Sequence, residues 1–527
     1  MNRNLFSSFV LAIITISLYA QDPNILWDIT IGGIGNDRLY SINKTNDGGY
    51  ILGGISESDI SGDKTENNIG NEDYWIVKLD ENGSIQWQNT IGGNYDDTLR
   101  KVFQTTDGGY IIGGYSNSTI SGDKSENVIG SEDYWVVKIN SLGTIEWENT
   151  IGGNGEDILY DIIEANDNGY ILAGSSNSNI SFDKSENSKG MRDYWLVKLN
   201  DLGIKQWDKT IGGNSGDILY SISSTSDDGL ILGGYSASDI SGDKTENNIG
   251  LSDYWVVKLD SSYNIEWQNT IGGNDTDTME SVLETSDGGF ILAGNSLSDI
   301  SGDKTENSNG LYDLWVVKLD NLGNIIWQNT LGGNDSDFLR AIAAADDGGY
   351  ILSGSSRSNI SGDKNEITLG FADYWVLKIN SNGILTGQNS IGGFSTEASF
   401  SVLQDTDGGF VIGGASDSPI SGDKTQNSKG SFDYWIVKID STLNVVESLL
   451  SKKTTLYPNP AKNTLQLETQ HQTIDKINIY TITGSKVLQL EVDTVSPTVD
   501  VSSLAAGVYY VQLYSGKNVA VKKFVKE

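Results

Sequence analysis

Short acidic loops carry the residues of this sequence that could bind a metal ion. The tetrapeptide SGDK begins at Ser61 and recurs along the chain, once as SFDK, and a glutamate follows most of its aspartates by three positions. Calcium takes about six to eight oxygen ligands in flexible geometry, so carboxylates spaced along a glycine-containing loop suit it. The candidate calcium ligands are Asp63, Glu66, Asp123, Glu126, Asp183, Glu186, Asp243, Glu246, Asp303, Glu306, Asp363 and Glu366.

The same carboxylates could instead stabilise the loops that contain them. Aspartates commonly cap backbone amides in turns, and Asp63 could also pair with Lys64 or Lys78. The loops lack the remaining ligands of an EF-hand, and one copy has Gln426 in place of the glutamate. Calcium binding and loop capping are therefore alternative hypotheses, and the sequence indicates no other cofactor.

The composition excludes several other kinds of site. The chain has no cysteine, and its one histidine is His471, so thiolate chemistry and histidine-dependent triads or zinc sites are absent from the first 450 residues. The formal net charge is −36, which argues against a nucleic acid partner because phosphate binding needs basic surface. The 62 glycines and 5 prolines predict many tight turns between short strands.

The elements that position these loops repeat along the chain. DYW, or DLW once, recurs every 60 residues from Asp73 to Asp433, and TIGG or a close variant recurs with the same period from Thr30 to Ser390. Seven copies run from about Trp27 to Val446 without insertion or deletion. Such strict length indicates seven equivalent units packed against one another.

Each unit predicts four strands. In the second unit these are DTLRKVFQTT, YIIGGYS, YWVVKIN and TIEWENT, with a TDGG hairpin turn after the first. Short strands in fours, repeated seven times, predict an all-β fold with a seven-bladed β-propeller over residues 21–450. An open β-solenoid is the less favoured alternative, because its coils are typically about 20–30 residues long. We interpret the repeated tryptophans as packing between blades, with ligand stacking as the alternative.

The ends of the array predict how the ring closes. The chain begins with an isolated fourth strand around Trp27, and the last unit has Gly387 where the others have tryptophan. We therefore expect Leu26–Ile31 to pair with Tyr434–Ile439 and complete the last blade. The alternatives are closure by Asn444–Leu449 or an open array.

A catalytic site in such an array should appear as a departure from the repeat. The turn at Asp47 resembles the Asp-box hairpin of sialidase-like propellers, but a glycosidase needs two carboxylates around one bond and the prominent carboxylates here recur in six or seven copies. The departures are Phe182, Arg192, Leu314, Gly387 and Glu397, which form no acid/base set. We expect no enzyme activity, with a polysaccharide-acting glycoside hydrolase or lyase as the alternative.

The first 20 residues predict a secretory signal peptide. Arg3 precedes the 12-residue apolar run FVLAIITISLYA, and Ala20 stands at the expected cleavage site. The run is shorter than the ~20 residues that a membrane-spanning helix needs, and no other segment is apolar enough to span a membrane.

The C-terminal segment differs from the repeats in having no tryptophan and a net positive charge. Its order of motifs resembles the C-terminal (type A) sorting domain of the type IX secretion system. The matching residues are Pro458, Asn459, Pro460, Gly484, Gly507, Tyr509, Lys522 and Lys523. The resemblance implies a small Ig-like β-sandwich over 456–527, after a linker at 451–455, that the type IX export machinery recognises.

The repeats themselves resemble the DGGY-type propeller repeats of secreted proteins that carry such tails. Both resemblances imply a protein that is secreted or attached to the outer-membrane surface. Because the repeat group has no single assigned activity, the ligand stays open. We expect a non-catalytic module that binds extracellular glycan or protein.

Overall fold

The computed structural model describes residues 25–441, 443–445, 454–469, 472–481, 486–515 and 518–527. The signal peptide, Gly484 and residues 451–453 of the linker lie outside these ranges. Every regular element of the described residues is a β-strand, and none of them is a helix able to cross a membrane. The chain divides into two compact units between Asn444 and Val445.

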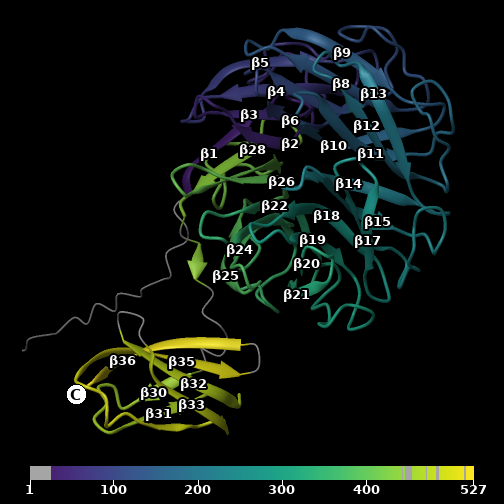
Figure 1. Ribbon diagram of the computed structural model, residues 1–527. Helices are drawn as coiled ribbons and strands as arrows, with labels where there is room; N and C mark the ends of the chain where they lie inside the picture. Colours follow the sequence, from purple (N-terminus) through teal and green to yellow (C-terminus); the bar gives the residue numbers. More distant parts are fainter. Residues whose placement is uncertain (1–24, 442, 446–453, 470–471, 482–485, 516–517) are drawn as a thin grey trace, which may run out of the picture. The chain divides into compact units, whose positions relative to one another are not determined.

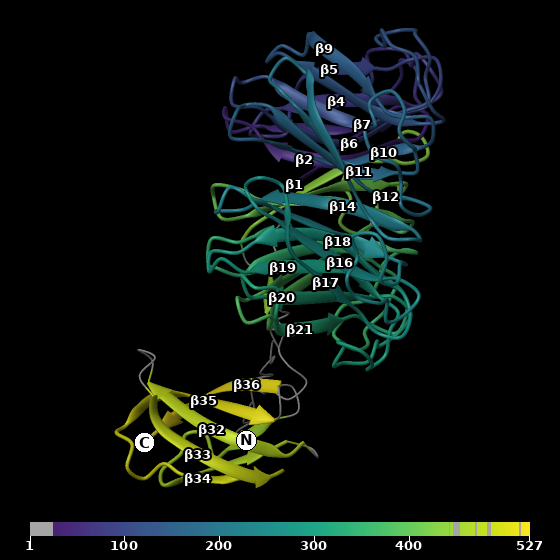
Figure 2. The same ribbon diagram turned by 45° about the vertical axis from the view of Figure 1, so that its right-hand side comes forward.

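The first unit is a ring of seven antiparallel blades, as predicted (Figures 1 and 2). Blades one to three are β2–β5 (Asp37–Lys44, Tyr50–Ser56, Asp73–Leu79, Ile85–Ile91), β6–β9 (Asp97–Gln104, Tyr110–Ser116, Asp133–Ile139, Ile145–Ile151) and β10–β13 (Asp157–Glu164, Tyr170–Ser176, Asp193–Leu199, Lys205–Ile211). Blades four to six are β14–β17 (Asp217–Ser224, Leu230–Ser236, Asp253–Leu259, Ile265–Ile271), β18–β21 (Asp277–Glu284, Phe290–Ser296, Asp313–Leu319, Ile325–Leu331) and β22–β25 (Asp337–Ala344, Tyr350–Ser356, Asp373–Ile379, Leu385–Ile391). Blade seven comprises β26–β28 (Glu397–Gln404, Phe410–Ser416, Asp433–Ile439) and β1 (Ile25–Ile31).

A DGG sequence, replaced by DNG in blade three and DDG in blade four, forms the hairpin between the first two strands of each blade. Gly48 has φ of +87°, a conformation that glycine adopts without strain. The Asp47 carboxylate accepts a hydrogen bond from the Gly49 amide and lies 2.9 Å from the ammonium of the buried Lys78. Although partial burial opposes it, hydrogen bonding from Thr45 and Lys78 lowers the pKa of Asp47 to about 2. Lys78 therefore pairs with Asp47, and the alternative pairing with Asp63 is wrong.

The DYW motifs fill the space between neighbouring blades. Trp75 is completely buried, and the Tyr74 ring packs 4.8 Å from Trp135 of the next blade. The Tyr74 hydroxyl donates a 3.0 Å hydrogen bond to the Trp135 carbonyl. Equivalent tryptophans are buried in all seven blades, which confirms the interpretation of these residues as packing between blades.

The N-terminal strand closes the ring. β1 pairs antiparallel with β28, with Ile31 opposite Tyr434 and Ile25 opposite Ile439 (Figure 1). The predicted closure is therefore confirmed. The segment proposed as the alternative behaves differently, because β29 (Asn444–Val445) adds to blade six beside β25, whose Gly387 stands at the tryptophan position. Residues 446–449 lie outside the described ranges.

One aspartate joins the last blade to the first. Asp405 stands where other units have threonine or alanine, and its carboxylate lies 2.6 Å from the ammonium of Lys438 in blade seven. The same carboxylate forms an ion pair with Lys44 and accepts a hydrogen bond from the Tyr50 hydroxyl, both in blade one. Despite partial burial, these partners hold the pKa of Asp405 far below its usual value. The junction at which the ring closes thus has polar contacts that no other junction repeats.

Each blade also contains a fully buried acid at the start of its third strand. The Asp73 carboxylate accepts hydrogen bonds from the Ile69 and Gly70 amides. Burial, together with repulsion from Asp97 of the next blade, raises the pKa of Asp73 to about 6. The pKa is likewise raised to about 6 in Asp193, Asp253, Asp373 and Asp433, and to about 7 in Asp133 and Asp313.

We expect acidification from pH 7.5 to pH 5 to raise the melting temperature of the propeller by a few degrees. In this range the folded protein retains protons on the Asp73-type carboxyls that the unfolded chain releases, so stability rises as the pH falls. The Asp47-type carboxylates oppose this only below about pH 4, because their pKa values are lowered to about 2. Calorimetry across this range tests the expectation. Asp73→Asn keeps an oxygen acceptor but cannot titrate, so the variant's melting temperature should depend less on pH. If the melting temperature of the wild-type protein fell steadily from pH 7.5 to pH 5, the expectation would be contradicted.

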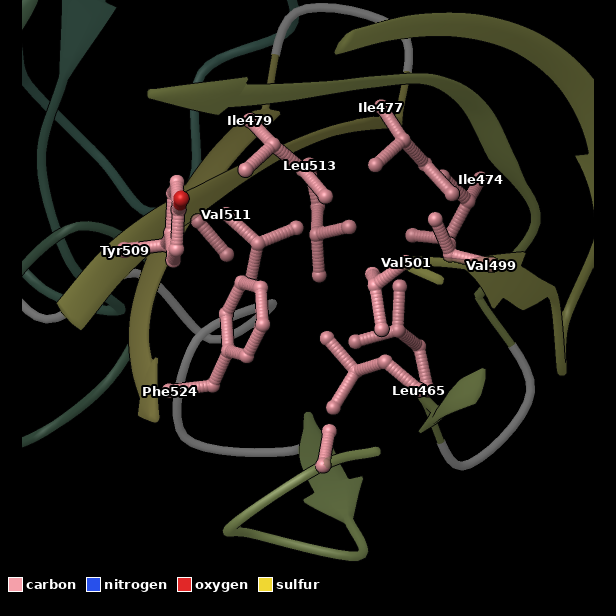
Figure 3. Close-up of a cluster of buried hydrophobic side chains, with 13 residues drawn as sticks. Leu465, Ile474, Ile477, Ile479, Val499, Val501, Tyr509, Val511, Leu513 and Phe524 are labelled. Carbon is pink, nitrogen blue, oxygen red and sulfur yellow. The ribbon is translucent and has the colours of Figure 1, made fainter. Parts of the chain in front are cut away.

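The second unit is the predicted β-sandwich. One sheet contains β30 (Thr455–Tyr457), β31 (Thr464–Glu468) and β34 (Thr498–Asp500). The other contains β32 (Ile474–Thr481), β33 (Lys486–Thr494), β35 (Gly507–Ser515) and β36 (Asn518–Lys526). Alternate residues of both sheets form one buried cluster, in which Leu465 and Val499 lie across from Leu513 and Phe524 (Figure 3).

Candidate functional site

The candidate calcium residues lie in the loop between the second and third strands of each blade. The Asp63 carboxylate accepts a 3.1 Å hydrogen bond from the Gly32 amide, just beyond β1 of the preceding blade. The Glu66 carboxylate instead accepts a 2.6 Å hydrogen bond from the Thr90 amide in β5 of its own blade. The two acids of one loop therefore act at separate strand ends.

The other copies repeat this arrangement. The loop aspartates accept hydrogen bonds from the glycine amides at Gly92, Gly152, Gly212, Gly272, Gly332 and Gly392. Glu126, Glu186, Glu246, Glu306 and Glu366 accept from the matching strand amides. Gln426 makes the same bond to Thr30, so the negative charge is not required. No group of three or more His, Asp or Glu side chains in the described ranges is arranged to hold a metal. The geometry favours capping over calcium binding.

We expect the melting temperature of the purified protein to be the same in EDTA and in millimolar calcium. The loop carboxylates already bind backbone amides, so an ion would have to displace these hydrogen bonds. Calcium held only by the folded state would add about 2.7 kcal/mol per site at a hundredfold excess over its Kd. Calorimetry under both conditions tests the expectation, and a large calcium-dependent rise would restore the calcium hypothesis.

The predicted departures from the repeat have different surroundings. Glu397 takes the place of a buried aspartate and accepts hydrogen bonds from the Gly393 amide and the Ser416 hydroxyl, which is a scaffold role. Phe182 is 78% exposed, whereas Leu314 is buried in the core. Arg192 forms an ion pair with Glu156. None of these five residues lines the cavity described next, although the charge of Arg192 acts on Tyr160 in its wall.

A cavity of about 300 Å³ lies at the centre of the ring, lined by the first strand of every blade. Several positions of each first strand line it, and at one of them the seven residues differ widely in chemistry. They are Tyr40, Arg100, Tyr160, Tyr220, Glu280, Arg340 and Phe400. The centre of a nearly seven-fold scaffold is therefore asymmetric.

Aromatic pairs and ion pairs order the cavity wall. The Tyr40 ring lies 5.0 Å from Phe400, and Tyr160 lies 4.7 Å from Tyr220, both edge-to-face. Arg340 pairs with Glu280 at 3.0 Å. Burial, partly offset by Arg100, raises the pKa of Tyr160 to about 12, so this phenol stays protonated. The wall offers ring faces, hydroxyl groups and charged groups within one small space.

Sequence reasoning missed this set, although a signal for it was present. Flanking positions of the first strand, such as Leu39 and Ile42, stay apolar in nearly every unit, while the position of Tyr40 changes from unit to unit. Aligning the seven units and comparing the positions of the first strand that vary between them would have found it.

One exposed loop position carries an apolar side chain in several blades. Met191, Leu251, Leu311 and Phe371 stand at equivalent positions of four consecutive blades and are between 58% and 75% exposed. Each directly precedes a residue of the loop that leads into the third strand, as Met191 precedes Arg192.

The predicted sorting motifs gather along the last strand of the sandwich. The Asn459 side chain accepts a 2.9 Å hydrogen bond from the Val525 amide, which fixes the Pro458–Pro460 loop against β36. Tyr509 stacks on Phe524, with ring centroids 5.6 Å apart. Gly507 begins β35. Lys522 and Lys523 lie in β36, where Lys523 is exposed.

Comparisons with known proteins identify the tail. Residues 455–527 match the family described as "Secretion system C-terminal sorting domain". No curated protein matches the chain.

Several solved structures are similar to the chain at low identity. One is PorZ of Porphyromonas gingivalis, described as a surface component of the type IX secretion system, with 11% identity and a TM-score of 0.37 over 95% of this chain and 60% of PorZ. The Pan2 WD40 domain of Neurospora crassa has 10% identity and a TM-score of 0.43 over 79% of this chain and 97% of that domain. Sqt1 of Chaetomium thermophilum has 11% identity and a TM-score of 0.38 over 80% and 100% of the two chains.

The tail thus has both the family match and a sandwich fold in which the described sorting motifs lie in or beside β35 and β36. It marks the chain for secretion through the type IX system.

Proposed function

We propose that the chain is a secreted, surface-delivered binding module whose propeller holds an extracellular glycan in its central cavity. The observation that carries this proposal is the ring of unlike side chains around the cavity on an otherwise repetitive scaffold. Protein sites for small ligands are typically concave, with ring faces and a few placed polar groups. The DGGY-type assignment of the repeats remains a prediction that agrees with such a role.

The carboxylates of the cavity support binding without catalysis, because they form ion pairs with neighbouring cations. Glu280 is paired with Arg340, and Asp161 lies 2.9 Å from Lys101. A glycosidase instead needs two carboxyl groups about 5–9 Å apart on either side of the bond that is cleaved.

A glycan array probed with the purified, secreted protein tests this function. We expect selective binding that Tyr220→Ala reduces at least tenfold, because this ring lies against Tyr160 in the cavity wall. Ile420→Ser is the matched control, since this side chain is 60% exposed in a loop away from the cavity. Binding unaffected by Tyr220→Ala would refute the cavity as the site, and release of shortened saccharides from bound glycan would favour the hydrolase or lyase alternative.

A further inference from the structure

The most unusual side chain of the cavity is Arg100. Its guanidinium carbon lies 5.1 Å from the ring centre of Tyr40 and 5.5 Å from those of Tyr115 and Tyr160. Its Nη2 donates a 3.2 Å hydrogen bond to the Tyr115 hydroxyl. Three tyrosines therefore surround one cation on the wall of the cavity.

Arg100 forms no ion pair among the described residues, although its charge acts at longer range on the carboxylates of Glu280 and Glu72. Its Nε is buried without a hydrogen-bond acceptor, and no carboxylate lies within ion-pair distance of its guanidinium. The neighbouring cations differ in this respect, because Lys101 pairs with Asp161 and Arg340 with Glu280. A buried, unpaired charge is costly for a protein unless it has a purpose.

The charge of Arg100 also contrasts with the rest of the chain. Outside residues 452–527 the protein has 26 Lys and Arg against 65 Asp and Glu, so carboxylates are plentiful partners for any cation. Arg38 and Arg192 add positive charge close to Tyr40 and Tyr160 respectively, although Arg192 is paired with Glu156. An acidic protein thus keeps one arginine unpaired at the centre of its ring.

We propose that Arg100 binds the carboxylate of an acidic sugar residue in the central cavity. This inference rests on the proposed function and specifies its ligand class. A guanidinium matches a carboxylate through parallel N–H donors, and the tyrosine faces suit the apolar face of a pyranose ring. The cavity of about 300 Å³ is at the small end of the usual range for ligand sites, which favours one sugar residue over a folded peptide segment.

Calorimetry and saturation-transfer NMR on the purified mature protein test the proposal. The probes are galacturonate, glucuronate and N-acetylneuraminate, with galactose and glucose as neutral counterparts and N-acetylaspartate amide as a non-sugar acid. We expect at least one acidic sugar to bind tenfold or more tightly than its neutral counterpart. Arg100→Gln should abolish that preference, and Arg100→Lys should keep part of it.

The matched control is Arg357→Gln, which removes an exposed arginine that stacks on Phe371 outside the cavity and should keep the preference for the acid. Melting temperatures establish whether each variant is folded. If Arg100→Gln does not fold, the comparison of Arg100→Lys with the wild-type protein tests the role of Arg100. If acidic and neutral sugars bound equally well in the cavity, the role of Arg100 would be overturned, whereas the proposal of glycan binding would be retained. Arg100-dependent binding of N-acetylaspartate amide alone would overturn the sugar, and failure of every probe would overturn the inference, while the glycan array separately decides the proposed function.

Discussion

Removing residues 24–31 should lower the melting temperature of the propeller sharply, on the order of 10 °C. The deletion removes β1, so β28 loses the strand that pairs with it from Tyr434 to Ile439. The Asp28 carboxylate, which accepts hydrogen bonds from the Trp435 indole and the Thr425 amide, is lost as well. Blade seven would then expose an open edge, which also favours aggregation.

Two measurements make this expectation specific. A synthetic peptide covering residues 24–31 should restore part of the lost stability when added to the truncated protein. Asp405→Thr keeps β1 and introduces the residue found at Thr45, so it should remove only the polar contacts of the same junction and destabilise less. Unchanged melting of the truncated protein would show that the ring does not depend on β1.

Deleting Leu456–Glu527 should leave a folded propeller that accumulates in the periplasm. The tail forms its own compact unit with its own core, so we expect the blades to fold without it. It also contains the whole segment that matches the sorting family. Fractionation of cells and the melting temperature of the retained protein check both parts of the expectation.

The reciprocal experiment is the control for export. Residues 451–527 fused to an unrelated periplasmic protein should carry it out of the cell. Within the full chain, Asn459→Ala removes the side chain that fixes the Pro458–Pro460 loop to β36 and should reduce export without affecting the propeller. Normal surface display of the truncated chain would contradict the role of the tail.

The propeller could be predicted from the sequence because the same strand and turn motifs recur in each of its seven units. A period of 60 residues places residues like Trp75 and Asp73 at equivalent points of every unit, and a glycine like Gly48 in five of the seven. An assignment of strand or turn made for one unit therefore applies to all seven. Ring closure could be predicted because the first strand of the array has the sequence of a blade's fourth strand but no preceding three strands to pair with. It must therefore complete the last blade.

The cavity could not be predicted in the same way. Tyr40, Arg100 and Glu280 look like ordinary polar or aromatic residues of separate strands, and only the closed ring brings them together. The hydrogen-bond partners of the loop carboxylates could not be predicted for a different reason. Their spacing does not reveal that Asp63 turns towards Gly32 and Glu66 towards Thr90, because those amides belong to strands distant in sequence.

The closure by β1 has a consequence for the order of events during folding. Trp435 and Asp28, which bond across the seventh blade, stand 407 positions apart. Contacts of such long sequence separation form late, since the entropy of closing the intervening loop must be overcome first. Blades one to six can form as soon as their hairpins form, because their strands are consecutive in the chain. Blade seven is complete only when β1, at the start of the array, pairs with β28 at its end. We therefore expect a slow final phase in refolding kinetics that is absent when β1 is deleted.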